Sequence, residues 1–202
     1  MNAEKILIVS DTGPLITLCI IDKLNILYEL YNDIYIPNAV YQELNSETHP
    51  NEIELIDGCD FIHVKDVIDS EKVSELVNSD LNLHLGESEA IILTEEINSN
   101  TKFLIIDDKD ARNYAETRGI NTIGAIGILA SAIKEGLLSS EELESCIDIM
   151  RKSHRYYSEM LYNGLRETAE EYKNNRDSKN KFVNKLSGKY ARQKSKGNKY
   201  DK

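Results

Sequence analysis

The sequence predicts an α/β fold of three layers, α/β/α, with a central, mainly parallel sheet of four to five strands and further helices at the C-terminus. Short apolar runs rich in β-branched residues, such as residues 6–9 (ILIV) and 103–106 (FLII), suit strands buried on both faces of a sheet. Segments with helical periodicity separate these runs. Strands that alternate with helices form parallel sheets through right-handed crossovers.

The expected elements follow one another regularly along the chain. Strands are expected at residues 5–10, 33–36, 61–67, 103–106 and 120–123. Helices are expected at residues 15–31, 37–44, 52–58, 70–81, 87–98, 111–119 and 124–136, with two more in 139–172, the second from about Ser153. Pro14 suits the first position of a helix, and Gly119 and Gly136 suit helix ends.

Charge divides the chain into an acidic body and a basic tail. Residues 1–172 hold 13 Lys and Arg against 33 Asp and Glu, a net of −20, whereas residues 173–202 hold 11 against 2, a net of +9. We expect an α/β domain over residues 1–137, a helical extension packed on it over 138–172, and a disordered tail over 173–202. The composition of the tail cannot bury enough surface to offset the entropy of ordering it.

Composition also excludes several classes of protein. No apolar run approaches the roughly 20 residues of a membrane span, and the N-terminus lacks the basic and apolar regions of a signal peptide. We therefore expect a cytoplasmic protein with no membrane partner. Cys19, Cys59 and Cys146 are scattered and form no CxxC pair, which indicates neither a disulfide framework nor a zinc site.

Carboxylates stand where two of the apolar strands end. Asp11 ends the first, and Asp107 and Asp108 end the strand over residues 103–106, with Asp110 two residues on. In open α/β sheets, ligands bind at the carboxyl ends of the strands. Acids there repel one another, so a hard divalent cation would supply the missing charge. The alternative is that one Asp caps the next helix while the others face solvent.

Helices that start beside the same edge can bring Glu43 and Glu87 to it. Four or five carboxylates from distant positions would then meet in one cleft. Such a set of oxygen ligands suits Mg²⁺ or Mn²⁺. The chemistry that matches it best is metal-assisted hydrolysis of a phosphodiester. The alternative for Glu87 is that it only complements the positive end of a helix dipole.

Five motifs in this order resemble a PIN domain of the prokaryotic group related to VapC-type toxins. They are SDTGPLI, IPNAVYQEL, LGESEAIIL, LIIDDKDAR and INTIGAIGILASAIKEGLL, and the resemblance covers residues 5 to about 137, with weaker similarity through the helix around Ser158–Leu165. It implies a metal-dependent ribonuclease fold with an acidic active site. It also implies a divalent-metal-dependent endoribonuclease that is the toxin of a toxin–antitoxin pair, with a small antitoxin protein as partner.

The resemblance assigns roles to individual residues. The catalytic acids are Asp11, Glu43, Glu87 and Asp108, and the metal ligands are Asp11, Glu87, Asp107 and Asp108. Supporting roles fall to Thr12, Glu89 and Asp110. Glu89 stands as an alternative to Glu87, and Asp107 as an alternative to Asp108. This chain departs from the pattern of many toxins around Asp107–Ala111, where they have a Thr or Ser two residues before the Asp and a Phe after it.

Single-stranded or looped RNA is the expected substrate, since a recessed cleft reaches a flexible backbone more easily than a duplex. Because the body is acidic, basic side chains are expected to capture the RNA. The candidates are Lys109 and Arg112, and in the tail Arg192, Lys194 and Lys196, together with a basic residue expected at position 188. A tail that only solubilises the protein or faces an antitoxin is the alternative.

Other functions remain compatible with the sequence. A non-catalytic PIN fold could bind RNA or protein, and a DNA structure-specific nuclease would share the metal chemistry. A DxDxT phosphatase is disfavoured, because Thr-Gly-Pro follows Asp11 and no second Asp stands two residues on. The apolar helical segment from Leu15 to Leu30 suits either the core or the face of a homodimer.

Overall fold

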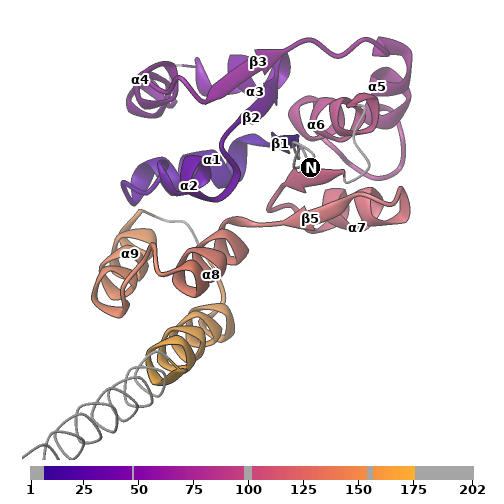
Figure 1. Ribbon diagram of the computed structural model, residues 1–202. Helices are drawn as coiled ribbons and strands as arrows, with labels where there is room; N and C mark the ends of the chain where they lie inside the picture. The colour runs from indigo at the N-terminus through magenta and orange to yellow at the C-terminus, as the bar shows by residue number, and fades with distance from the viewer. Residues whose placement is uncertain (1–6, 47, 98–101, 154–156, 176–202) are drawn as a thin grey trace, which may run out of the picture.

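A single parallel sheet forms the centre of the molecule (Figure 1). The computed structural model describes residues 7–46, 48–97, 102–153 and 157–175 of the 202-residue chain. The strands of these segments are β1 (Ile8–Ser10), β2 (Ile34–Pro37), β3 (Ile62–Lys65), β4 (Phe103–Ile105) and β5 (Asn121–Ile123). All neighbours pair in parallel, in the order β3-β2-β1-β4-β5. The predicted α/β class is confirmed.

Helices cover both faces of the sheet. They are α1 (Thr12–Ile20), α2 (Ile26–Tyr31), α3 (Asn38–Leu44), α4 (Pro50–Asp57), α5 (Ser70–Val77), α6 (Leu85–Glu96), α7 (Lys109–Thr117), α8 (Ala125–Glu135) and α9 (Ser140–Lys152), with a last helix at 159–175. Successive strand residues point to opposite faces. Ile8 of β1 therefore packs in the core with α1, α2 and α8, whereas Val9 packs in the core with α5, α6 and α7.

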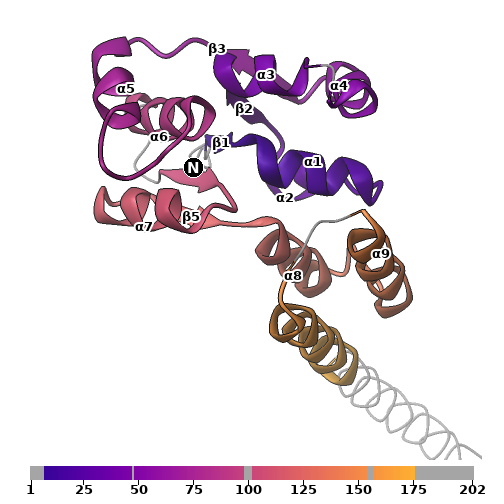
Figure 2. The same ribbon diagram turned by 180° about the vertical axis from the view of Figure 1, so that it is seen from behind.

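α9 packs beside α1, and the last helix lies next to α8 and α9, both away from α5 to α7 (Figures 1 and 2). Ile147 of α9 and Leu165 of the last helix are buried in the same apolar cluster as Leu18 of α1. The described part of residues 138–172 is therefore continuous with the main core. No helix in the segments that the structure describes is long and apolar enough to span a membrane.

The strand order reverses beside β1. The chain passes from β1 to β2 and β3 in one direction, then returns to place β4 on the other side of β1. Ser10 pairs with Ile105, and the Asp11 amide continues the ladder by donating to the Ile105 carbonyl at 2.9 Å. The residues after β1 and β4 thus lie at the point where ligands bind in doubly wound sheets.

Two sequence predictions about helices are wrong. The single helix expected over 15–31 is broken into α1 and α2, because Asp22 adopts a positive φ of 53°. Its amide bonds to the Cys19 carbonyl and that of Lys23 to the Leu18 carbonyl, which together terminate α1 in a Schellman motif. Moreover, α1 starts at Thr12, so Pro14 is its third residue, where the amide would lack a helical partner in any case.

Candidate active site and metal centre

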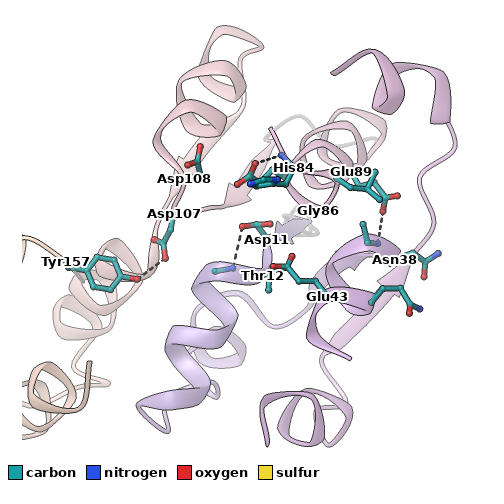
Figure 3. A pocket seen from close by; sticks show the side chains of 15 residues that line it. Asp11, Thr12, Asn38, Glu43, His84, Gly86, Glu89, Asp107, Asp108 and Tyr157 are labelled. Atoms are coloured by element: carbon teal, nitrogen blue, oxygen red, sulfur yellow. Dashed lines mark hydrogen bonds between the residues drawn. The ribbon is translucent and has the colours of Figure 1, made fainter. Parts of the chain in front are cut away.

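A cleft opens at the carboxyl edge of the sheet, above β1 and β4 (Figure 3). Its volume is about 1010 Å³. The described residues that line it are Asp11, Thr12, Gly13, Asn38, Ala39, Gln42, Glu43, His84, Leu85, Gly86, Glu87, Glu89, Asp107, Asp108 and Tyr157. The first turns of α1, α3 and α6 contribute to its walls, together with the residues that follow β4. The cleft therefore receives side chains from segments far apart in the sequence.

Asp11 lies deepest among the acids. It follows β1, is 7% exposed, and caps α1 by accepting a hydrogen bond from the Gly13 amide at 3.4 Å. Burial raises the pKa of its carboxyl from 3.8 to about 7, and the charges of Glu87 and Glu43 act in the same direction. Hydrogen bonds from the backbone of Thr12 and Gly13 oppose this increase in pKa only partly.

Glu43 reaches the same space from α3. The Thr12 hydroxyl donates to Glu43 Oε2 at 2.7 Å, which ties the end of α3 to the start of α1. Gly86 lies beside this carboxylate and that of Asp11: a Cβ added at residue 86 would lie 3.3 Å from Glu43 Oε2 and 3.7 Å from Asp11 Oδ1. Both carboxylates are therefore near one glycine, as Figure 3 shows, and α6 can approach this closely because residue 86 has no side chain.

The two acids in the first turns of α6 differ in their surroundings. Glu87 Oε2 accepts a hydrogen bond from the His84 amide at 2.8 Å, and Glu89 Oε2 accepts one from the Ala39 amide, also at 2.8 Å. Burial raises the pKa of Glu87, and the charges of Asp108 and Glu43 add to this effect. The charge of Glu87 thus interacts with those of Asp11 and the acids near it. Glu89 instead holds the start of α3 against α6 through its hydrogen bond.

Asp107 and Asp108 leave β4 in different directions. Asp108 Oδ1 caps α7 by accepting hydrogen bonds from the amides of Asp110 and Ala111, both at 2.8 Å. Asp107 Oδ1 accepts one from the Ala125 amide at the start of α8, at 2.9 Å. Its Oδ2 accepts one from the Tyr157 hydroxyl, also at 2.9 Å. Both acids face the cleft. Asp108 in addition caps α7, which is the alternative role that the sequence left open for one of the Asp residues.

Some residues predicted for the site lie outside this cleft. Asp110 lines a separate, smaller pocket with Asp80, Asn82 and Asn113. Lys109 and Arg112, on α7, are not among the residues that line the cleft. The predicted contribution of these three residues to the site therefore finds no support in the geometry of the cleft.

The basic candidates of the tail need one correction. The prediction of a basic residue at position 188 is wrong: the residue there is Gly188, which carries no charge, and the neighbouring lysine is Lys189. Arg192, Lys194 and Lys196 are basic as expected. All of these tail positions fall outside the described residues, so their role in capturing RNA stays a prediction.

Four residues of the cleft were missed as functional candidates. Helical spacing in the sequence places Tyr157 only on one side of the last expected helix, and its contact with Asp107 spans 50 positions. Asn38, Gln42 and His84 line the walls, and isolated polar residues of this kind give no signal in one sequence. The motifs IPNAVYQEL and LGESEAIIL point toward these walls, but through Glu43 and Glu87.

The chemistry of the cleft fits a divalent metal ion. Among the described residues, no three His, Cys, Asp or Glu side chains are gathered closely enough to hold an ion in the present arrangement. The donors are nevertheless carboxylate oxygens, the ligands of hard cations. No Lys or Arg is among the described lining residues, so the charge of buried Asp11 is unbalanced. A bound cation would balance it.

Comparison with known families agrees with the fold. The family model described as a PIN domain matches residues 7–171. The match also includes α9 and most of the last helix, where the resemblance seen in the sequence is weaker and limited to the region around Ser158–Leu165. No curated protein matches the chain. PIN domains are generally nucleases that use divalent metal ions. This chain belongs to the PIN domain family.

Proposed function

We propose that this protein is a divalent-metal-dependent endoribonuclease. One observation carries the proposal: a cleft at the reversal point of the sheet is lined by six carboxylates and, among its described residues, by no Lys or Arg. Structural ion pairs elsewhere in the molecule join acids to bases, as at Glu144 and Arg166. Acids gathered without a base favour a metal ion as the missing positive charge.

The residues that would hold the ion are Asp11, Glu87, Asp107 and Asp108. When bound, Mg²⁺ or Mn²⁺ would activate water and stabilise the leaving oxygen of the phosphodiester. Asp11, fixed by the start of α1, keeps the ligand set anchored to β1. Thr12 orients the Glu43 carboxylate through its 2.7 Å hydrogen bond, so that Glu43 can accept a proton from the attacking water.

RNA is the proposed substrate, and single-stranded regions of it in particular. A cleft whose acids lie within its walls admits a flexible strand more easily than a rigid duplex. We further propose that the protein is cytoplasmic and acts as the toxin of a toxin–antitoxin pair, with a small antitoxin as partner. A homodimer, and capture of RNA by the basic tail, are proposals that rest on the sequence alone.

Cleavage of a mixed RNA pool tests the proposal. Purified protein with Mn²⁺ should cut RNA, and Asp11→Asn should lose about 100- to 1,000-fold in rate, the cost of removing one group that stabilises a charged transition state. Asp60→Asn is the matched control, since it removes an exposed acid outside the cleft. Single-stranded and branched DNA of the same length are tested in parallel.

Each outcome has a clear meaning. Cutting of DNA in preference to RNA would replace the proposed substrate with a DNA structure. Binding of RNA without cutting, at all Mn²⁺ concentrations, would contradict catalysis and favour a binding module. Equal rates for Asp11→Asn and the wild type would remove Asp11 from the mechanism.

A further inference from the structure

A hydrogen-bonded connection links the C-terminal segment to the cleft. Tyr157 lies just before the last helix, and its hydroxyl donates to Asp107 Oδ2 at 2.9 Å. The same hydroxyl lies 3.0 Å from Thr17 Oγ1 on α1. Figure 3 shows the tyrosine entering the cleft from the side opposite α3 and α6. One side chain thus joins α1, the end of β4 and the C-terminal segment.

The two contacts of Asp107 fix the plane of its carboxylate. Oδ1 accepts from the Ala125 amide and Oδ2 accepts from Tyr157. A carboxylate oxygen has two lone pairs, so each oxygen keeps one for another partner. The hydroxyl therefore orients Asp107 and leaves it able to serve as a ligand.

Packing of the last helix holds Tyr157 itself. Its ring meets the ring of Tyr162 edge-on, with centroids 6.3 Å apart. Tyr162 is only 2% exposed, and Arg151 of α9 lies over its ring, 5.1 Å from the centroid. The position of the hydroxyl consequently depends on burial of the last helix in the main core.

We propose that Tyr157 is a positioning residue that sets the orientation of Asp107 for metal binding. The C-terminal segment is then a structural part of the active site, since the orienting hydroxyl comes from it. This inference rests on the proposed metal-dependent nuclease function. Groups that orient metal ligands typically change metal affinity by 10- to 100-fold when they are removed.

Tyr157→Phe tests the inference, because it removes the hydroxyl and keeps the ring. Calorimetric titration with Mn²⁺ should give a Kd raised by about 10- to 100-fold. Saturating Mn²⁺ should restore most of the RNA cleavage rate, which loss of structure would not allow. Tyr41→Phe is the matched control: it removes another hydrogen bond from Tyr to Asp, the 3.2 Å contact with Asp57, outside the cleft. Its Kd should equal that of the wild type.

Five results would overturn the inference. Unchanged Mn²⁺ affinity in Tyr157→Phe would show that the hydroxyl does not orient a ligand. Tighter binding would show that it withholds Asp107 from the metal. Equal weakening in Tyr41→Phe, or a rate that saturating Mn²⁺ does not restore, would show that the effect is not specific to metal positioning. If the wild type binds no Mn²⁺, the proposed function falls together with the inference.

Discussion

Two acidic regions of the molecule place their carboxylates in opposite electrostatic situations. At the start of α9, Glu142 accepts a hydrogen bond from the Ser139 amide at 3.0 Å and pairs with Lys23 Nζ at 2.9 Å. These contacts, the backbone hydrogen bond first, lower the pKa of Glu142 to about 2. In the cleft, burial raises the pKa of Asp11 to about 7. The acid at α9 stabilises the fold, whereas the acid in the cleft costs stability.

The difference separates structural acids from candidate functional ones. The carboxylate of Glu142 already has its partners, because it belongs to a capping box and pairs with Lys23. A buried acid close to two other acids needs a counter-charge, and the described lining of the cleft supplies no Lys or Arg. A perturbed pKa in a cleft is a recognised mark of a functional site.

Asp11→Asn tests the comparison most strongly, because it removes the free-energy cost of ionising the buried Asp11 carboxyl. The folded pKa of about 7 exceeds the ordinary value of 3.8, so folding takes up a proton between these pH values. Stability of the metal-free protein should therefore fall as pH rises from about 4 to 7. At pH 8 the variant should be more stable than the wild type by on the order of 4 kcal/mol, since one pKa unit corresponds to about 1.36 kcal/mol.

Thermal unfolding in EDTA at pH 5 and pH 8 measures this effect. The advantage of the variant should be much smaller at pH 5, where Asp11 is protonated in the folded protein. Asparagine keeps an oxygen that can accept from the Gly13 amide, so the cap is retained. A variant that is less stable than the wild type at pH 8 would contradict the assigned cost of Asp11.

Gly124→Ala tests the other side of the cleft. A Cβ there would lie 2.5 Å from Asp107 Oδ1, so the carboxylate must move away from the Ala125 amide. Because a displacement of about 1 Å can cost 100-fold in rate, we expect a large loss of RNA cleavage. Gly58→Ala, whose Cβ would meet nothing closer than 3.4 Å, is the control and should keep full activity. Similar rates for the two variants would exclude Asp107 from the site.

Glu142→Gln should have the smallest effect, with the opposite sign from Asp11→Asn. The folded pKa is depressed, so the contribution of Glu142 is present above its ordinary pKa of 4.5 and is lost as pH falls toward 2. Since the pair with Lys23 is exposed, the loss at pH 7 should be below about 1 kcal/mol. Urea unfolding at pH 7 and pH 3 measures it. A stabilising effect at pH 7 would contradict the comparison.

The sequence allowed much of the sheet and its acids to be predicted. Apolar runs marked β1 and β4, and the acids directly after them had to share one edge once the strands were parallel. Gly136 also marked the end of α8, where its φ of 74° suits glycine. The end of α1 was missed because Asp22 adopts the same region of φ without being a glycine.

The orientation of the acids could not be predicted. Whether Asp107 or Asp108 turns toward α7 depends on how α7 and α8 start, and each takes the amide hydrogen bonds nearest to it. Tyr157 reaches Asp107 only because the last helix is buried through Tyr162. These outcomes follow from tertiary packing, which leaves no local pattern in the chain.

The most direct test of the central claim is the difference between the unfolding temperatures of the wild type and Asp11→Asn at pH 8, measured in EDTA and in Mn²⁺. In EDTA the variant should unfold at the higher temperature. In Mn²⁺ at 100 times its Kd the wild type should gain about 2.7 kcal/mol, while the variant gains much less, so the gap between them should narrow. An equal gap in both conditions would show that the acids of the cleft do not bind a metal ion.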